Sequence, residues 1–204
     1  MLNFLGIFSV DSNLFRLDKD ILLYIQDNIR CGILDKIFPT ITHLADGGIF
    51  WIILTAVLLF FKKTRKAGVA SAIALVGSLL LNNGILKPLV NRTRPYELID
   101  TLKLIGKAAS DGSFPSGHTA GSFASAVALF PNLKKRYGIP LLILAFCISF
   151  SRLYIGIHYP SDVAAGFLSG LVLGILANVI VNLIIRKWQS LKAAEQDSRK
   201  ESNV

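Results

Sequence analysis

The stretch VAAGFLSGLVLGILANVIVNLII, residues 163–185, contains no charged residue and is followed at once by Arg186-Lys187. A transmembrane helix needs about 20 consecutive apolar residues, so this segment is long enough to cross a bilayer. The chain is 52% hydrophobic and only 17% charged, with a mean hydropathy of +0.55. Four more apolar segments without Asp, Glu, Lys or Arg precede this one: 47–61, 67–86, 112–133 and 137–151. The pattern predicts an all-α integral membrane bundle of about five transmembrane helices.

The N-terminal segment differs from the rest, because charged and apolar residues alternate in it. Residues 1–46 hold six Asp against two Lys and two Arg. The apolar residues of 18–44 recur at helical spacing, which predicts one or two amphipathic helices lying at the interface. The first ten residues lack a basic residue and a cleavage site, which argues against a signal peptide. We expect an interfacial segment 1–46, a transmembrane domain 47–187 and a polar cytoplasmic tail 188–204, disordered after Lys192.

Basic clusters predict the orientation of the helices. They lie at residues 62–66 and 134–136 and in the tail from Arg186. If the chain crosses the membrane five times, all three clusters lie on the same side. The positive-inside rule assigns that side to the cytoplasm. Loops 87–117 and 152–162 of this multi-pass cell-membrane protein are then extracytoplasmic. The net charge of +9 reflects orientation and anionic membrane lipids, since no soluble basic module is present to bind nucleic acid.

Those two outer loops gather ionisable residues from the ends of four apolar segments. Such residues at membrane depth are costly and usually functional. Lys87, Arg94 and Arg152 offer the positive charge and the donors that a multiply charged oxyanion requires. We therefore expect an anion to bind at this face of the membrane.

Two short motifs add reactive groups to the cations. Pro115 precedes Ser116-Gly117-His118 at a predicted helix start, where free backbone N–H groups favour anions and glycine permits close approach. In the other loop, His158 stands four residues before Asp162, at the first turn of the last apolar helix. A carboxylate that holds one imidazole nitrogen leaves the other free to attack, and His118 can protonate the leaving oxygen.

Together these residues form the pattern Lys87-x6-Arg94-Pro95, Pro115-Ser116-Gly117-His118 and Ser151-Arg152-x5-His158-x3-Asp162. The pattern resembles the three-part signature of the type 2 phosphatidic acid phosphatase family, which includes bacterial undecaprenyl-diphosphate phosphatases and vanadium haloperoxidases. The match spans about 75 residues, in the family's order and spacing.

The resemblance implies a role for each matching residue. His158 would be the nucleophile that forms a phosphohistidine, Asp162 would orient it, and His118 would be the general acid. The phosphoryl oxygens would be bound by Lys87, Arg94, Arg152, Ser116 and the Gly117 backbone N–H. The resemblance also implies that no divalent metal is used. For this chain we expect no cofactor, and a lipid phosphate or diphosphate as the substrate.

Other residues have simpler interpretations. Arg92 has no place in the pattern and is expected to anchor a lipid headgroup. Tyr154 and Tyr159 are expected in the aromatic belt at the membrane interface. The small residues of the last span are expected to permit close helix packing: Gly166, Ser169, Gly170 and Gly174.

Rival functions fit the residues less well. Ser116 and His158 could suggest an intramembrane serine protease, but Phe114 stands where such proteases carry glycine, and three cations would have no use. A non-catalytic lipid-phosphate transporter would need the cations but not the His158–Asp162 pair, and repeated halves are not evident. Haloperoxidase activity would call for a soluble, differently embellished chain. The short chain favours undecaprenyl diphosphate, with phosphatidylglycerophosphate or phosphatidate as alternatives, and oligomeric state is left open.

The predicted orientation can be tested with an impermeant thiol reagent on intact cells. Lys103→Cys should react and Lys134→Cys should not, in a background without Cys31 and Cys147, because only the first position lies outside the cytoplasm. Labelling at position 134 without labelling at position 103 would show that the orientation is reversed.

Overall fold

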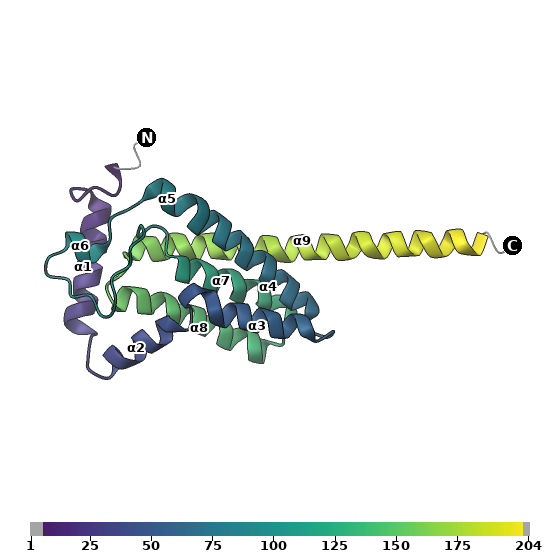
Figure 1. Cartoon of the computed structure of the whole chain (residues 1–204), viewed down its shortest axis with the longest axis horizontal. Helices are drawn as coiled ribbons and strands as arrows, with labels where there is room; N and C mark the ends of the chain where they lie inside the picture. Colours follow the sequence, from purple (N-terminus) through teal and green to yellow (C-terminus); the bar gives the residue numbers. More distant parts are fainter. Residues whose placement is uncertain (1–5, 202–204) are drawn as a thin grey trace.

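A computed structural model describes the backbone of residues 6–201 and the side chains of residues 6–196. Residues 1–5 of the N-terminal segment and 202–204 of the tail lie outside the described residues. The described part is helical throughout its regular structure and has no strand, which confirms the all-α prediction (Figure 1).

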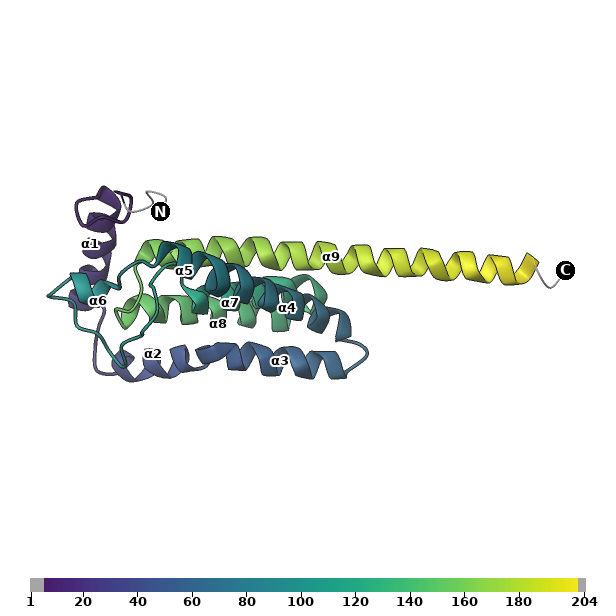
Figure 2. The same ribbon diagram turned by 45° about the horizontal axis from the view of Figure 1, so that its top comes forward.

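Five of the described helices run along one another as a bundle, and the remaining α-helices gather at one end of it (Figures 1 and 2). In chain order the elements are α1 (Asn13–Asn28), α2 (Leu34–His43), the 3-10 turn η2 (Asp46–Gly48), α3 (Ile49–Phe60), α4 (Arg65–Ser78), the π-helix η3 (Leu79–Leu86), α5 (Lys87–Val90), α6 (Pro95–Leu98), α7 (Gly117–Leu129), the 3-10 turn η4 (Phe130–Asn132), α8 (Lys135–Tyr154) and α9 (Pro160–Glu201).

Length and hydropathy make three of the described helices candidate membrane spans: 65–98, 135–154 and 160–196. Helix α2 and the helix formed by η2 and α3 meet at a bend of 46°, and together they make a fourth candidate if they are one span. In that case part of the expected interfacial segment belongs to a membrane span. The remaining apolar segment forms α7, which has only 13 residues and is buried along most of its length. Since α7 contacts α3, α4, α8 and α9, it is the central helix of the bundle.

The last helix is longer than the sequence suggested. We expected disorder after Lys192, but α9 continues to Glu201. Residues 187–201 contain neither glycine nor proline, so nothing in their composition breaks the helix. The projecting part of α9 is visible in both ribbon views (Figures 1 and 2).

The small residues of α9 allow it to lie directly on α7. A Cβ atom at Gly166 would lie 2.7 Å from the backbone oxygen of Ser116, and one at Gly170 would lie 2.6 Å from that of Ala120. Both distances are shorter than real Cβ atoms tolerate. The predicted close packing is confirmed, and it places the beginnings of α7 and α9 side by side.

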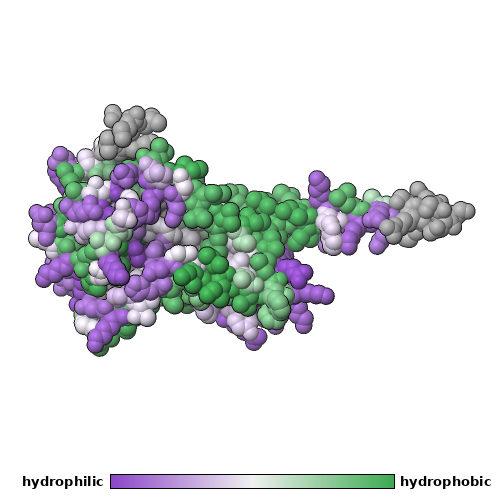
Figure 3. Space-filling model, in the orientation of Figure 1, coloured by the Kyte–Doolittle hydropathy of each residue, from purple (hydrophilic) through white to green (hydrophobic). Residues whose placement is uncertain are grey.

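The surface is divided into bands along the bundle. Figure 3 shows apolar residues around its middle and hydrophilic residues over the end that carries α1, α6 and the long loop. The basic clusters 62–66 and 134–136 lie at the other end, where α3 joins α4 and α7 joins α8 (Figure 2). This distribution suits a protein whose middle faces lipid.

Helix α1 lies across the polar end and is held there by a buried carboxylate. The Asp18 side chain is 2% exposed and accepts from Nη2 of Arg92 at 2.8 Å. It also accepts from the backbone N–H of Ser161 at 2.9 Å and from the Ser161 hydroxyl. The amphipathic N-terminal helix is thereby joined to the start of α9.

This attachment predicts different effects for two neighbouring aspartates of α1. Asp18→Asn removes a buried charge that faces Arg92, and breaking such a pair costs about 3–5 kcal/mol. Asp20 is exposed on the same helix, so Asp20→Asn should change the stability by no more than about 0.5 kcal/mol. Thermal unfolding in detergent measures both, and equal midpoints would contradict the role of Asp18.

Candidate functional site

The starts of α7 and α9 lie side by side and position two of the predicted motifs. Ser116 is the N-cap of α7, where its hydroxyl accepts from the backbone N–H and the hydroxyl of Thr119. The Ser116 N–H donates to the backbone oxygen of Asp162 at 3.1 Å, which ties the two helix starts together. Between α8 and α9 the chain turns at Gly156, whose φ of +79° favours glycine. The predicted helix starts at both motifs are confirmed.

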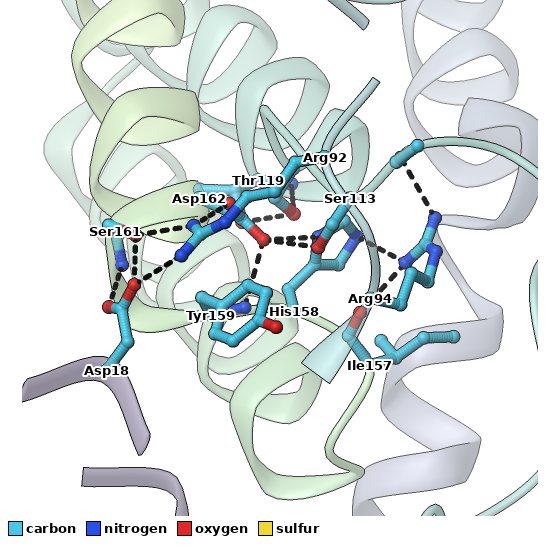
Figure 4. A network of polar contacts seen from close by, with 12 residues as sticks. Asp18, Arg92, Arg94, Ser113, Thr119, Ile157, His158, Tyr159, Ser161 and Asp162 are labelled. Atoms are coloured by element: carbon cyan, nitrogen blue, oxygen red, sulfur yellow. Dashed lines mark hydrogen bonds and ion pairs between the residues drawn. The ribbon is translucent and has the colours of Figure 1, made fainter. Parts of the chain in front are cut away.

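His158 lies in that turn with its two ring nitrogens in different surroundings. Nδ1 is 3.4 Å from Oδ2 of Asp162, and Nε2 is 3.4 Å from Nη1 of Arg94 at the cavity (Figure 4). Burial lowers the pKa of His158 to about 3, and the charges of Arg152 and Arg94 act the same way, although Asp162 opposes them. The imidazole is therefore neutral near pH 7, with Nε2 available as a nucleophile.

Asp162 is fixed by more partners than the histidine. Its Oδ2 accepts from the Ser113 hydroxyl at 2.5 Å and from the backbone N–H of Tyr159 at 3.0 Å. Its Oδ1 accepts from Nη1 of Arg92 at 2.6 Å (Figure 4). The carboxylate is fully buried, so it is locked in place beside His158.

The expectation for Arg92 was wrong. Instead of reaching a lipid headgroup, its side chain is 3% exposed and bridges Asp18 and Asp162. Its guanidinium carbon also lies 3.7 Å from the centre of the Tyr159 ring. A buried cation that pairs with two buried carboxylates offsets part of the cost of burying them, which explains why it points inward.

The expected belt positions of Tyr154 and Tyr159 were also wrong, because both side chains are buried. Tyr159 packs against Arg92, and the Tyr154 hydroxyl donates to Asp35 at 2.7 Å. Both rings belong to the contacts that attach the N-terminal helices to the bundle.

Two of the predicted phosphate ligands already hold an anion from their own chain. Asp111 accepts from Nζ of Lys87 at 2.6 Å and from Nη2 of Arg94 at 2.7 Å. Partial burial would raise the pKa of Asp111, but these two cations outweigh it and lower the pKa to about 2. Lys87 and Arg94 thus converge on one position where an oxyanion can bind.

The third cation, Arg152, has no carboxylate within salt-bridge distance among residues 6–196. Its side chain is largely buried; Nη1 donates to Thr42 at 2.7 Å, and Nε has no hydrogen-bond partner in the described chain. Burying a guanidinium without a counter-charge is costly. Since Arg152 also lines the cavity, an anion bound there would supply the missing partner.

A cavity of about 390 Å³ joins these groups. Six of the predicted site residues line it directly: Lys87, Arg94, Gly117, His118, Arg152 and His158. Ser116 and Asp162 are not among its lining residues, since Ser116 caps α7 and Asp162 lies behind His158. His118 places Nε2 2.8 Å from Oδ1 of Asp46.

Sequence reasoning missed several polar partners of the site. Asp18, Asp46, Asp111 and Ser113 all contact predicted site residues or Arg92, but each lies in a stretch with no motif of its own. A weak signal existed for Arg92, because it lies between the predicted site residues Lys87 and Arg94 in the sequence.

Comparisons with known proteins agree with this geometry. Undecaprenyl-diphosphatase of Sulfolobus acidocaldarius is 38% identical over 120 residues, which cover 59% of this chain and 58% of that relative, less than two thirds of its length. Lipid A 4'-phosphatase of Bacteroides thetaiotaomicron is 29% identical over 187 residues, which cover 85% of this chain and 81% of that relative.

Solved structures show the same architecture. Aquifex aeolicus LpxE superposes with a TM-score of 0.71 at 30% identity, covering 79% of this chain and 94% of that one. The PAP2-type phosphatidylglycerolphosphate phosphatase of Bacillus subtilis also superposes with a TM-score of 0.71, at 26% identity. This match covers 86% of this chain and 90% of that one.

The family model described as the PAP2 superfamily matches residues 65–186, more than half of the 204-residue chain. This match includes all three motifs and confirms the resemblance seen in the sequence. The chain is a multi-pass membrane protein that belongs to the PAP2 superfamily.

Proposed function

We propose that this protein is a membrane lipid phosphatase that hydrolyses a phosphate monoester or diphosphate of a lipid through a phosphohistidine on His158, with undecaprenyl diphosphate the favoured substrate. One observation supports this most strongly. The cavity that contains His158 and the three cations continues between α3 and α4, where most of its lining residues are apolar.

The apolar part of the cavity opens toward the side of the bundle. Ile52, Val76 and Leu79 line it and are 55%, 56% and 60% exposed, respectively. These side chains lie in the segments predicted to cross the bilayer, so an acyl or prenyl chain could enter from the membrane. A molecule with an anionic head and an apolar tail fits both parts at once.

Charge supports the assignment of the phosphate ligands. Lys87 and Arg94 converge on a carboxylate, and Arg152 is a buried cation that has no carboxylate partner within the described chain. A bound phosphoryl group would displace Asp111 and contact all three cations, with the Gly117 backbone N–H at the start of α7 and Ser116 beneath it. These cations supply the charge stabilisation that a metal ion would otherwise provide, so we propose that the reaction needs no metal.

The reaction then proceeds in two balanced steps. Nε2 of His158 attacks phosphorus, the bond to the leaving oxygen breaks, and His118 gives that oxygen a proton. Water next attacks the phosphohistidine, passes a proton to His118 and releases phosphate, which restores both histidines. Asp162 holds Nδ1 and stabilises the charge that develops on His158.

The choice of substrate rests on similarity as well as on the site. Relatives are named undecaprenyl-diphosphatase, lipid A phosphatase and phosphatidylglycerophosphatase, so the head group varies among them. Ala109 and Asp111 of the loop 96–113 line the cavity, and we propose that this loop contacts the head group. We also propose that the cavity faces away from the cytoplasm, because the basic clusters lie at the other end of the bundle (Figure 2).

A phosphate-release assay on purified protein in excess EDTA tests the proposal. Polyprenyl diphosphate should be hydrolysed faster than the other lipids compared: phosphatidylglycerophosphate, phosphatidate, sphingosine phosphate and lipid A. The His158→Ala variant should release no phosphate from any of them. Absence of release from every lipid would indicate a binding or transport protein, while activity that returns only with magnesium would contradict a metal-free site.

The two histidines should fail in different ways. His158→Ala removes the nucleophile and should abolish turnover of every substrate. His118→Ala removes the acid, worth about 10²–10⁴-fold, so its defect should be large for a lipid alkoxide and much smaller for nitrophenolate. Single-turnover rates on both leaving groups, with folding checked by thermal unfolding, make the comparison. Equal proportional losses in the two variants would refute this division of roles.

A further inference from the structure

His118 is held by a carboxylate from a distant part of the chain. Its Nε2 lies 2.8 Å from Oδ1 of Asp46, a residue 72 positions earlier. The other oxygen of Asp46, Oδ2, lies 2.6 Å from Nδ1 of His43 at the end of α2. One carboxylate therefore contacts two imidazoles, and one of these lines the cavity.

The local backbone explains how Asp46 reaches this position. It begins the short turn η2, and the following Gly47 and Gly48 have φ values of +58° and +72°. Residues with side chains rarely adopt such values, so the two glycines permit the 46° bend between α2 and α3. The bend directs the carboxylate toward the first turn of α7.

We propose that Asp46 is a positioning residue for His118, which orients the ring and keeps it protonated until its proton passes to the leaving oxygen. This inference rests on the proposed function, in which His118 is the general acid. With Nε2 bound to Asp46, Nδ1 is the ring nitrogen left to face the leaving oxygen. Asp46 exchanges no proton itself: His118 gives one to the leaving oxygen and regains one from the attacking water.

The surrounding charges show why His118 needs such a partner. His118 shares the cavity with Arg152 and Lys87, and nearby cations disfavour a protonated imidazole. The carboxylate of Asp46 acts in the opposite direction. The site thus contains two histidine–carboxylate pairs with opposite tasks: Asp162 orients a neutral nucleophile, and Asp46 supports a cationic acid.

Asp46→Asn tests the role directly, because it keeps the shape of the side chain and removes its charge. Phosphoenzyme formation should slow by about 10- to 100-fold with an alkyl phosphate, part of the 10²–10⁴-fold due to the acid, and by less than about 3-fold with a nitrophenyl phosphate. Asp35→Asn is the matched control: this carboxylate binds Tyr154 outside the cavity and should change neither rate selectively.

A double variant separates positioning from a structural role. In a His118→Ala background, Asp46→Asn should add no further loss, because it acts only through the missing ring. Equal losses on both leaving groups, or a further loss without His118, would overturn the inference. If the defect of His118→Ala depends on the leaving group and that of Asp46→Asn does not, only the role of Asp46 is overturned. If the defect of His118→Ala does not depend on the leaving group either, the division of roles between the two histidines is overturned as well.

His43→Gln gives a second variant if Asp46→Asn does not fold. The His43 side chain is 71% exposed, so its replacement should leave the fold intact while it releases Oδ2 of Asp46. We expect a loss of about 2- to 5-fold with the alkyl phosphate and none with the nitrophenyl phosphate, a small part of the acid's contribution. An equal loss of rate with the alkyl and the nitrophenyl phosphate would count against the role of Asp46.

Discussion

The arrangement of the polar end depends on one buried cation. Arg92 lies between Asp18 of α1 and Asp162 of α9, and all three side chains are almost fully removed from solvent. Two buried carboxylates without a cation would be strongly unfavourable, so removing Arg92 would affect both. Through Arg92 the amphipathic N-terminal helix is coupled to the carboxylate that orients His158, although α1 contributes nothing to the cavity lining.

Close packing of α7 on α9 is the second requirement. Glycines of α9 bring the backbones of these helices into contact where both begin, and the N–H of Ser116 reaches the backbone oxygen of Asp162. A larger residue would separate the helices and, with them, the two motifs that each helix start carries. The catalytic arrangement proposed for His118 and His158 therefore depends on residues that carry no reactive group.

The site resolves a conflict between charge and burial. Three cations gather at a place where unpaired charge is expensive, and Asp111 forms ion pairs with two of them. Arg152 keeps its charge without a carboxylate partner in the described chain. A phosphoryl group would satisfy this need, while the apolar extension of the cavity would accept the tail that soluble phosphate esters lack.

Much of the architecture could be predicted from the sequence. The apolar segments indicated membrane helices, the basic clusters 62–66 and 134–136 were expected together at one end, and the order of the segments indicated that Lys87, His118 and His158 share a face. These features follow from local composition and from the period of a helix, which act within a few residues. The motif residues were therefore identifiable before any contact was known.

Only the tertiary structure decided which polar residues are partners. Asp46 meets His118 across 72 residues, and Asp18 meets Arg92 across 74. Arg92 and Tyr159 looked like interfacial residues but are buried, because the α1 helix and the Phe8 ring cover them. Burial and ion pairing depend on which distant segments the fold brings together, and local composition contains no information about that.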